Sequence, residues 1–238
     1  MSENRKVISS QNRKRLQKDI IDILKNPLTD NGIYYTHDDQ DMLKGYAVIF
    51  GPSDTLYRYG AYSFRFEYPT NYPFSPPKVV YLTNDGQTRF HPNLYRNGKV
   101  CISILNTWKG EQWTSCQSIR SVLLMLVTLF HNKPLLNEPG ITEKNKSFKP
   151  YNEIIQYKNI QVAILKSLTA LPEKNYTFHS YYKKYINENK EDIKKYLENL
   201  ESKIGTKTAK TSIYSMNVNI NYSELKKKVF KKLETLSN

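Results

Sequence analysis

The chain has 238 residues, 39% of them hydrophobic and 13% aromatic, so it is long enough to bury a core and is too apolar for a disordered protein. Its two cysteines exclude a disulfide framework and a four-cysteine metal site, and favour free thiols in a reducing compartment. The net charge of +14 favours an acidic partner, but the basic residues are dispersed and accompany no recognition motif, so we expect protein docking and no nucleic-acid binding.

The amino-terminal part of the chain predicts a helix from about Ser9 to Asn26, which Pro27 ends. Residues 1–19 lack the apolar segment of a secretory signal, so we expect an intracellular protein, cytoplasmic or nuclear. The helix has an apolar face made of Leu16, Ile20, Ile23 and Leu24. Its outer face carries four basic residues: Arg13, Lys14, Arg15 and Lys18. These basic residues form either a solvated face or a docking surface.

Strand patterns follow at residues 45–50, 61–68 and 78–82, with a weaker one at 32–36. In the second of these, "AYSFRFEY", aromatic residues alternate with polar ones, as in a half-buried strand. Because the gaps between the strands are short, the pattern favours an antiparallel meander over parallel units with helical crossovers.

Between two of these strands lies "YPTNYPFSPPKV", which contains four prolines and predicts a stiff loop. A stiff loop presents an aromatic side chain outward at low entropic cost. Phe74 is therefore either a residue presented for docking or a core residue, and the pattern alone favours neither.

The second half of the chain predicts helices at residues 119–130, 151–171 and 177–200. No apolar run, including "VLLMLVTLF" at 122–130, reaches the roughly 20 residues that cross a bilayer. Residues 202–220 have no helical period and predict a linker or loop. The chain closes with a basic amphipathic helix that Asn221 and Glu224 begin as a capping box. We expect this helix to pack onto its own domain rather than on a membrane or partner.

The segment "HPNLYRNGKVCISIL" places Cys101 ten residues after His91, and two kinds of nucleophilic chemistry fit a cysteine there. A cysteine hydrolase needs a histidine base, but Pro92 fixes His91 in a turn. A thioester carrier needs instead a donor for the oxyanion, which Asn93 supplies, and a carboxylate that helps an incoming lysine lose its proton. Glu138 in "NEPG" is the candidate for that carboxylate.

The motifs "YPFSPPKV", "HPN", "NGKVCISIL" and a following Trp-Thr-Ser together resemble the ubiquitin-conjugating enzymes over roughly residues 10 to 172. The longer loop "NTWKGEQW", the "NEPG" turn and the closing helix are similar to the large Z-type subclass with a carboxy-terminal extension. The resemblance implies an α+β fold with an N-terminal helix, a four-stranded antiparallel meander and further helices. It also implies two parts, a catalytic core over residues 1–172 and a helical extension over 173–238.

The resemblance further implies a function and roles. Cys101 takes ubiquitin, or a ubiquitin-like protein, from an activating enzyme as a thioester and passes it to substrate lysines, usually with a ubiquitin ligase. Asn93 stabilises the oxyanion or holds the loop, while His91 and Pro92 are structural. The basic face of the first helix docks the activating enzyme, which consumes the ATP, so neither a bound cofactor nor a metal is expected. The ligase-facing residues are Phe74, Ser115 and Cys116.

The chain departs from the family pattern at two places. The usual Trp-Ser-Pro-Ala of the ligase-facing loop is here Trp113-Thr114-Ser115-Cys116, which places a second thiol there. The acid often found two residues after the catalytic cysteine is Ser103, which gives Glu138 more weight. The alternative function is a catalytically inactive ubiquitin-binding scaffold of the same fold.

Overall fold

The computed structural model describes residues 8–169 and 176–236. Helix α1 (Ser10–Lys25) begins where the Ser9 hydroxyl accepts a hydrogen bond from the backbone N–H of Asn12, at 3.2 Å. It buries Leu16 and Ile23 of the expected apolar face and ends before Pro27, as predicted. The prediction is wrong for Leu24, which is 52% exposed, because the buried stripe passes through Asp19 instead.

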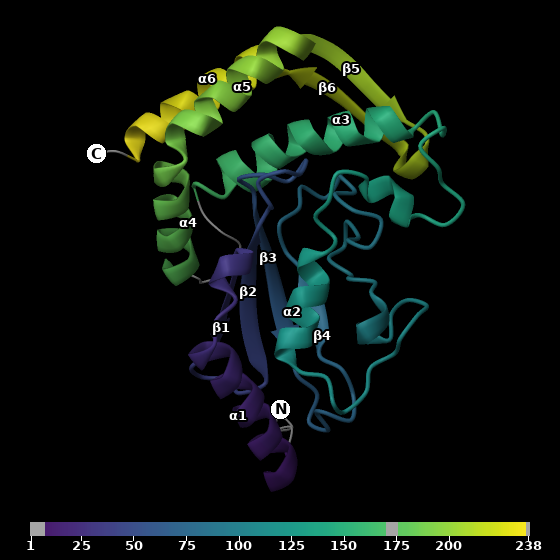
Figure 1. Cartoon of the computed structure of the whole chain (residues 1–238), viewed down its shortest axis with the longest axis vertical. Coiled ribbons are helices and arrows are strands. Elements are labelled where there is room, and N and C mark those ends of the chain that lie inside the picture. Colours follow the sequence, from purple (N-terminus) through teal and green to yellow (C-terminus); the bar gives the residue numbers. More distant parts are fainter. Residues whose placement is uncertain (1–7, 170–175, 237–238) are drawn as a thin grey trace, which may run out of the picture.

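A four-stranded antiparallel sheet follows the helix, and its strands are neighbours in chain order (Figure 1). The strands are β1 (Ile33–His37), β2 (Lys44–Phe50), β3 (Ala61–Glu67) and β4 (Lys78–Tyr81). The expected meander is therefore confirmed, including its weakest strand. Strand β3 is more buried than its alternation predicts, since its polar residue Ser63 is buried as well, and the backbone N–H of Ser63 donates to the Thr83 hydroxyl at 2.9 Å.

Helices cover the sheet in the second half of the chain. Helix α2 (Ile119–Val127) begins with reciprocal hydrogen bonds between Ser118 and Ser121. Helix α3 (Phe148–Lys158) runs directly into a π-helical stretch, η4 (Asn159–Lys166). The helix expected at 151–171 thus starts earlier, and the end expected at residue 171 lies outside the described residues. Three short 3-10 turns precede α3: η1 (Thr29–Asn31), η2 (Ser103–Leu105) and η3 (Pro134–Asn137).

The prediction of one helix over 177–200 is wrong, because the structure has two. These are α4 (Tyr176–Glu188) and α5 (Lys190–Ile204), which meet at an angle in Figure 1. The chain turns at Asn189, whose side-chain amide donates to the carbonyl of Tyr185, four residues earlier. Apolar residues keep the same spacing on both sides of this turn, so the periodicity alone cannot show the break.

The prediction of a linker over 202–220 is also wrong, because most of this segment forms a β-hairpin. Strands β5 (Thr206–Thr211) and β6 (Met216–Asn221) pair antiparallel, joined through the turn η5 (Ile213–Ser215). The residues that alternate with asparagine in β6 are Met216, Val218 and Ile220. Such alternation is a strand pattern that the polar composition of the segment obscured.

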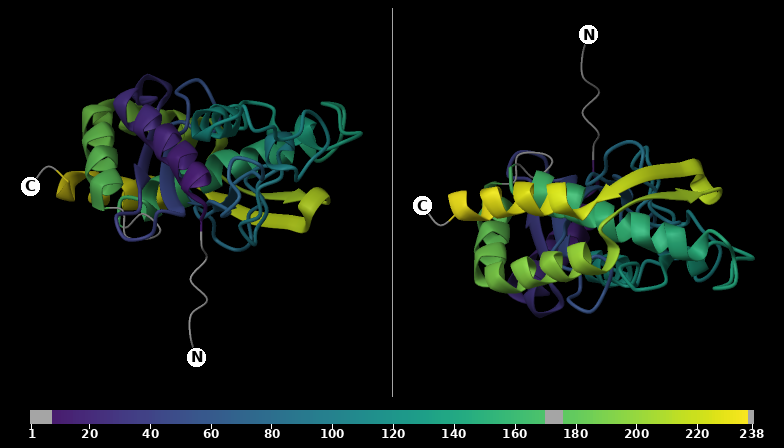
Figure 2. Two further views of the ribbon diagram at one scale, coloured as in Figure 1. Left: turned by 90° about the horizontal axis from the view of Figure 1, so that it is seen from below. Right: turned by 90° about the horizontal axis from the view of Figure 1, so that it is seen from above.

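The last helix, α6 (Tyr222–Thr235), packs back onto the chain as expected. Its buried side chains are Tyr222, Leu225, Val229 and Leu233, and Lys226 forms an ion pair with Glu201 of α5. The Asn221 side chain caps the helix by accepting from the N–H of Glu224 at 3.0 Å, while the Glu224 carboxylate pairs with Lys228. Helices α5 and α6 and the hairpin thus lie over α3, on the side away from α1 (Figures 1 and 2).

Two expectations concern the chain as a whole. Over residues 8–169 and 176–236, no helix is both long and apolar enough to cross a membrane. The boundary expected between residues 172 and 173 falls outside the described residues. The α+β class itself is confirmed by the helices and the meander.

Candidate active site

A tight turn brings Asn93 next to Cys101. Leu94 bridges to Val100 in antiparallel fashion, and the Cys101 N–H donates to the Asn93 carbonyl at 2.9 Å. The turn needs Gly98, which has a φ of +86° and lies so close to β4 that an added Cβ would be 2.9 Å from the Tyr81 carbonyl oxygen. The eight-residue spacing between Asn93 and Cys101 therefore produces a spatial pair.

The Asn93 side chain makes a second hydrogen bond to Cys101. Its Nδ2 donates to the carbonyl oxygen of Cys101, and its Oδ1 is buried without a hydrogen-bond partner among the described residues. Asn93 is 5% exposed and Cys101 is 2% exposed. Because Nδ2 carries two hydrogens, one can hold the cysteine backbone while the other remains for a second acceptor.

His91 shapes the turn from beneath. It is fully buried, and its Nδ1 accepts the backbone N–H of Asn93 at 3.0 Å. Burial lowers the pKa of His91 well below its usual value, so the ring is neutral and carries its hydrogen on Nε2. With Nδ1 occupied and Nε2 protonated, the ring offers no lone pair to the thiol of Cys101, which disfavours a hydrolase dyad.

Glu138 is connected to the turn through two residues that the sequence reasoning missed. The Tyr214 hydroxyl, at the tip of the β5–β6 hairpin, donates to the Glu138 carboxylate. The Tyr214 ring lies 4.9 Å from the guanidinium of Arg89, which donates to the His91 carbonyl at 3.2 Å and to the Pro92 carbonyl at 2.6 Å. No sequence pattern marked Tyr214, because its segment looked like a linker. Arg89 could have been identified by its position two residues before His91.

The expected ligase-facing residues are all exposed. Phe74 is 67% exposed, and so belongs to the surface rather than to the core. The loop that carries Phe74 is fixed by Trp113, whose Nε1 donates to the Pro73 carbonyl at 2.6 Å. Ser115 and Cys116 are exposed as well.

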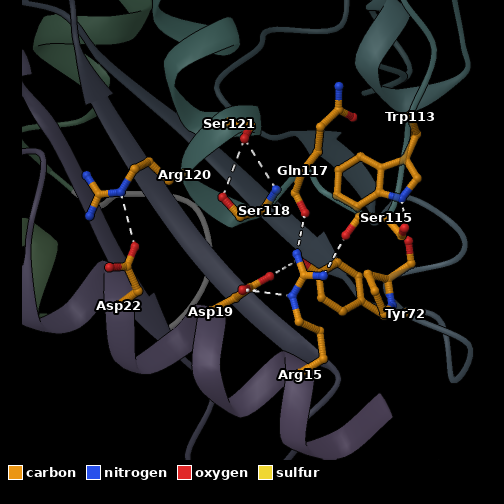
Figure 3. Close-up of polar contacts among 11 residues, drawn as sticks. Arg15, Asp19, Asp22, Tyr72, Trp113, Ser115, Gln117, Ser118, Arg120 and Ser121 are labelled. Carbon is orange, nitrogen blue, oxygen red and sulfur yellow. Dashed lines mark hydrogen bonds and ion pairs between the residues drawn. The ribbon is translucent and has the colours of Figure 1, made fainter. Parts of the chain in front are cut away.

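The four basic residues of α1 divide into two groups. Arg13, Lys14 and Lys18 are exposed, whereas Arg15 is half-buried. In Figure 3 the Arg15 side chain reaches from α1 to the loop before α2. There its guanidinium donates to the carbonyls of Ser115 and Gln117, at 2.5 and 2.6 Å, while its Nε donates to Asp19 at 3.1 Å.

The buried carboxylate of Asp19 also accepts the hydroxyl of Tyr72 from the proline-rich loop (Figure 3). Arg15 and Asp19 together thus join α1, the loop that carries Phe74 and the loop before α2. A second arginine, Arg120 of α2, pairs with Asp22 at 3.1 Å and fixes the same helix farther along. The loop that carries Phe74, the loop before α2 and the basic helix α1 are therefore one connected structure.

Metal binding finds no support in the part of the chain that the structure describes. Within it, no group of three or more histidine, cysteine, aspartate or glutamate residues could hold a metal ion.

Comparison with known proteins agrees with the family that the motifs indicate. Residues 15–164 match a family model described as "Ubiquitin-conjugating enzyme". The chain is 43% identical over 157 residues to Ubiquitin-conjugating enzyme E2 Z of Xenopus tropicalis, covering 65% of this chain and 50% of that protein. It is 38% identical over 204 residues to the protein of the same name from Danio rerio, covering 81% of this chain and 62% of that protein. The chain thus spans between half and two thirds of the length of these relatives.

Proposed function

The chain belongs to the ubiquitin-conjugating enzyme family, and on this basis we propose that it carries ubiquitin, or a ubiquitin-like protein, as a thioester on Cys101. It receives the modifier from an activating enzyme and passes it to lysines of protein substrates, usually with a ubiquitin ligase. The likeness to relatives named E2 Z supports a Z-type member of the family.

The chemistry consists of two acyl transfers. In the first, the Cys101 thiolate attacks the thioester carbon at ubiquitin's carboxyl terminus, so a new C–S bond forms and the activating enzyme's thiolate leaves. In the second, a lysine amine attacks the same carbon, a C–N bond forms, and the Cys101 thiolate leaves. The amine's proton passes to the Glu138 carboxylate and from there to water.

The double link between Asn93 and Cys101 is the observation that carries this proposal. The backbone carbonyl and the side-chain amide of Asn93 both hydrogen-bond to the backbone of Cys101, so the amide is fixed beside the cysteine. It can hold the loop in shape or donate its remaining hydrogen to an oxyanion on the acyl group. This arrangement supports a reactive site over the inactive scaffold, which has no use for a cysteine held against an amide.

Partner surfaces follow from the exposed side chains. The exposed charges of Arg13, Lys14 and Lys18 suit an acidic surface of the activating enzyme. Phe74, Ser115 and Cys116 offer an aromatic anchor and a rim to the ligase. The fourth basic residue, Arg15, contributes to docking through the shape of α1 and the loop that it holds.

The same proposal includes the organisation and the compartment. We assign residues 1–172 to the catalytic core and 173–238 to the extension, in keeping with the family match over 15–164. Both cysteines are free, which suits a reducing compartment, the cytoplasm or the nucleus.

The proposal is tested by incubating the protein with a ubiquitin-activating enzyme, ATP and ubiquitin, followed by electrophoresis without reductant. We expect a band heavier by one ubiquitin that thiol removes. Cys101→Ala should abolish the band, while the matched control Cys116→Ala should keep it. Equal loss of the band in both variants would mean that Cys101 is not the specific nucleophile. The absence of a band with any activating enzyme or modifier would favour the inactive scaffold.

A further inference from the structure

The tip of the β5–β6 hairpin reaches the active-site turn from the carboxy-terminal extension. Tyr214 has a φ of 63° and a ψ of 8°, and Ser215 has a φ of 48°. Two successive residues with a Cβ in this left-handed region persist only when surrounding contacts hold them. The contacts of Tyr214 therefore help to hold the tip in this shape.

Tyr214 is held on three sides. Its hydroxyl donates to the Glu138 carboxylate, and its carbonyl accepts from the guanidinium of Arg96. Its ring lies 4.9 Å from the Arg89 guanidinium and 6.1 Å from the ring of Tyr151. Burial and the bond to Glu138 raise the pKa of Tyr214, so its hydroxyl keeps its hydrogen and acts as a donor.

Arg89 extends this hold to the active-site turn. Its guanidinium lies 3.3 Å from the centre of the Tyr95 ring, and it donates to the carbonyls of His91 and Pro92. Its backbone N–H also donates to the sulfur of Met216, the first residue of β6. The hairpin tip and the turn before Asn93 therefore share one arginine.

The backbone of Glu138 is held by its N–H, which donates to the Leu135 carbonyl at 3.1 Å, and by its carbonyl, which accepts from Ile141 at 3.2 Å. Its side chain has only the Tyr214 hydroxyl as a hydrogen-bond partner among the described residues. Glu138 ends the short turn η3 and is followed by Pro139 and Gly140, both exposed. A half-buried carboxylate at the end of such a loop samples several orientations unless a neighbour selects one. Tyr214 is that neighbour, and it also links the carboxylate to the Arg89 contacts of the turn.

We infer that Tyr214 is a positioning residue for lysine transfer: its hydroxyl orients the Glu138 carboxylate toward the incoming amine. The inference rests on the proposed function, in which Glu138 takes the proton of that amine. It assigns the carboxy-terminal hairpin to the active-site wall. The loading of Cys101, which involves no amine, is independent of Tyr214.

The test uses the full chain with Tyr214→Phe, which removes the donor and keeps the ring. After charging with ubiquitin, the activating enzyme is stopped and the discharge of the thioester is followed with lysine and, separately, with hydroxylamine. Hydroxylamine is uncharged at neutral pH and needs no carboxylate. We expect unchanged charging, a discharge to lysine slower by about tenfold, and a discharge to hydroxylamine changed by less than about twofold.

Two variants separate positioning from a loss of folding. Tyr182→Phe also removes a buried hydroxyl in the extension, one that donates to the carbonyls of Tyr59 and Ala163. It should leave unchanged the ratio of the discharge rate with lysine to the discharge rate with hydroxylamine. Glu138→Gln should lower that ratio as Tyr214→Phe does, and the double variant should be no slower than Glu138→Gln alone. The deficit of Tyr214→Phe should also shrink as the pH rises toward the pKa of lysine, about 10.4.

The inference and the proposed function fail in different ways. A native chain that forms no thioester overturns both. A native chain that charges and discharges normally, with Tyr214→Phe equally fast toward lysine or equally slowed toward both nucleophiles, overturns the inference alone. Losses from Tyr214→Phe and Glu138→Gln that multiply in the double variant overturn it as well.

Discussion

Arg15 should contribute far more to stability than the other basic residues of α1. Arg15→Ala removes three charge-assisted hydrogen bonds, one to Asp19 and two to the carbonyls of Ser115 and Gln117. The Asp19 side chain is 8% exposed and, among the residues that the structure describes, would keep only the Tyr72 hydroxyl as a partner. Removing one member of a buried pair costs about 3–5 kcal/mol, but the Arg15 side chain is 25% exposed, so water replaces part of the loss. We therefore expect a destabilisation of about 2–3 kcal/mol.

The matched control is Lys18→Ala, at an exposed position one turn along the same helix. Such a surface substitution changes stability by less than about 0.5 kcal/mol. Urea unfolding followed by circular dichroism measures both free energies, and a thermal melt should show Arg15→Ala lower by roughly 4–12 °C. Equal stabilities for the two variants would mean that the guanidinium contacts of Arg15 contribute nothing to the fold.

Three further predictions concern the turn and the docking face. Asn93→Ala should charge nearly normally but release ubiquitin to lysine at least about tenfold more slowly in single-turnover gels, and unchanged release would exclude an oxyanion role. Replacing Arg13, Lys14 and Lys18 with glutamate should slow the transfer of ubiquitin to Cys101, and the difference in rate from the native chain should narrow as salt rises. An unchanged transfer rate would contradict docking of the activating enzyme at these residues. Because the pKa of His91 is lowered in the fold, the His91 ring becomes protonated below about pH 6.5 in the unfolded chain but stays neutral in the folded one. The contribution of His91 to the free energy of unfolding should therefore fall with decreasing pH, by up to about 1.4 kcal/mol per pH unit. His91→Asn should show a shallower dependence by urea unfolding, and identical slopes would contradict a neutral buried ring.

The core of the fold and the pairing at the site were predictable from local patterns. The meander follows from alternating strands with short gaps, and each strand carries its own pattern. Asn93 and Cys101 flank an Asn-Gly pair, which is a strong turn signal, so their proximity was encoded within a short segment.

The parts that were missed depend on contacts distant in sequence. The bend at Asn189 leaves the apolar period intact, and the hairpin strand β6 hides its alternation among asparagines. Arg15 looks like its basic neighbours in sequence, because the carbonyls that bind it lie about a hundred residues away. Tyr214 was invisible for the same reason, since its partner Glu138 lies 76 residues before it.

The carrier chemistry of Cys101 is tested most directly by Cys101→Ser. An activated ubiquitin transferred to a serine gives an oxygen ester, which thiol does not remove. We predict that the native chain forms an adduct heavier by one ubiquitin that thiol removes. Cys101→Ser should form an adduct of the same mass, at residue 101, that survives thiol. A thiol-sensitive adduct that persists in Cys101→Ser, or an adduct that maps to Cys116, would show that Cys101 is not the carrier.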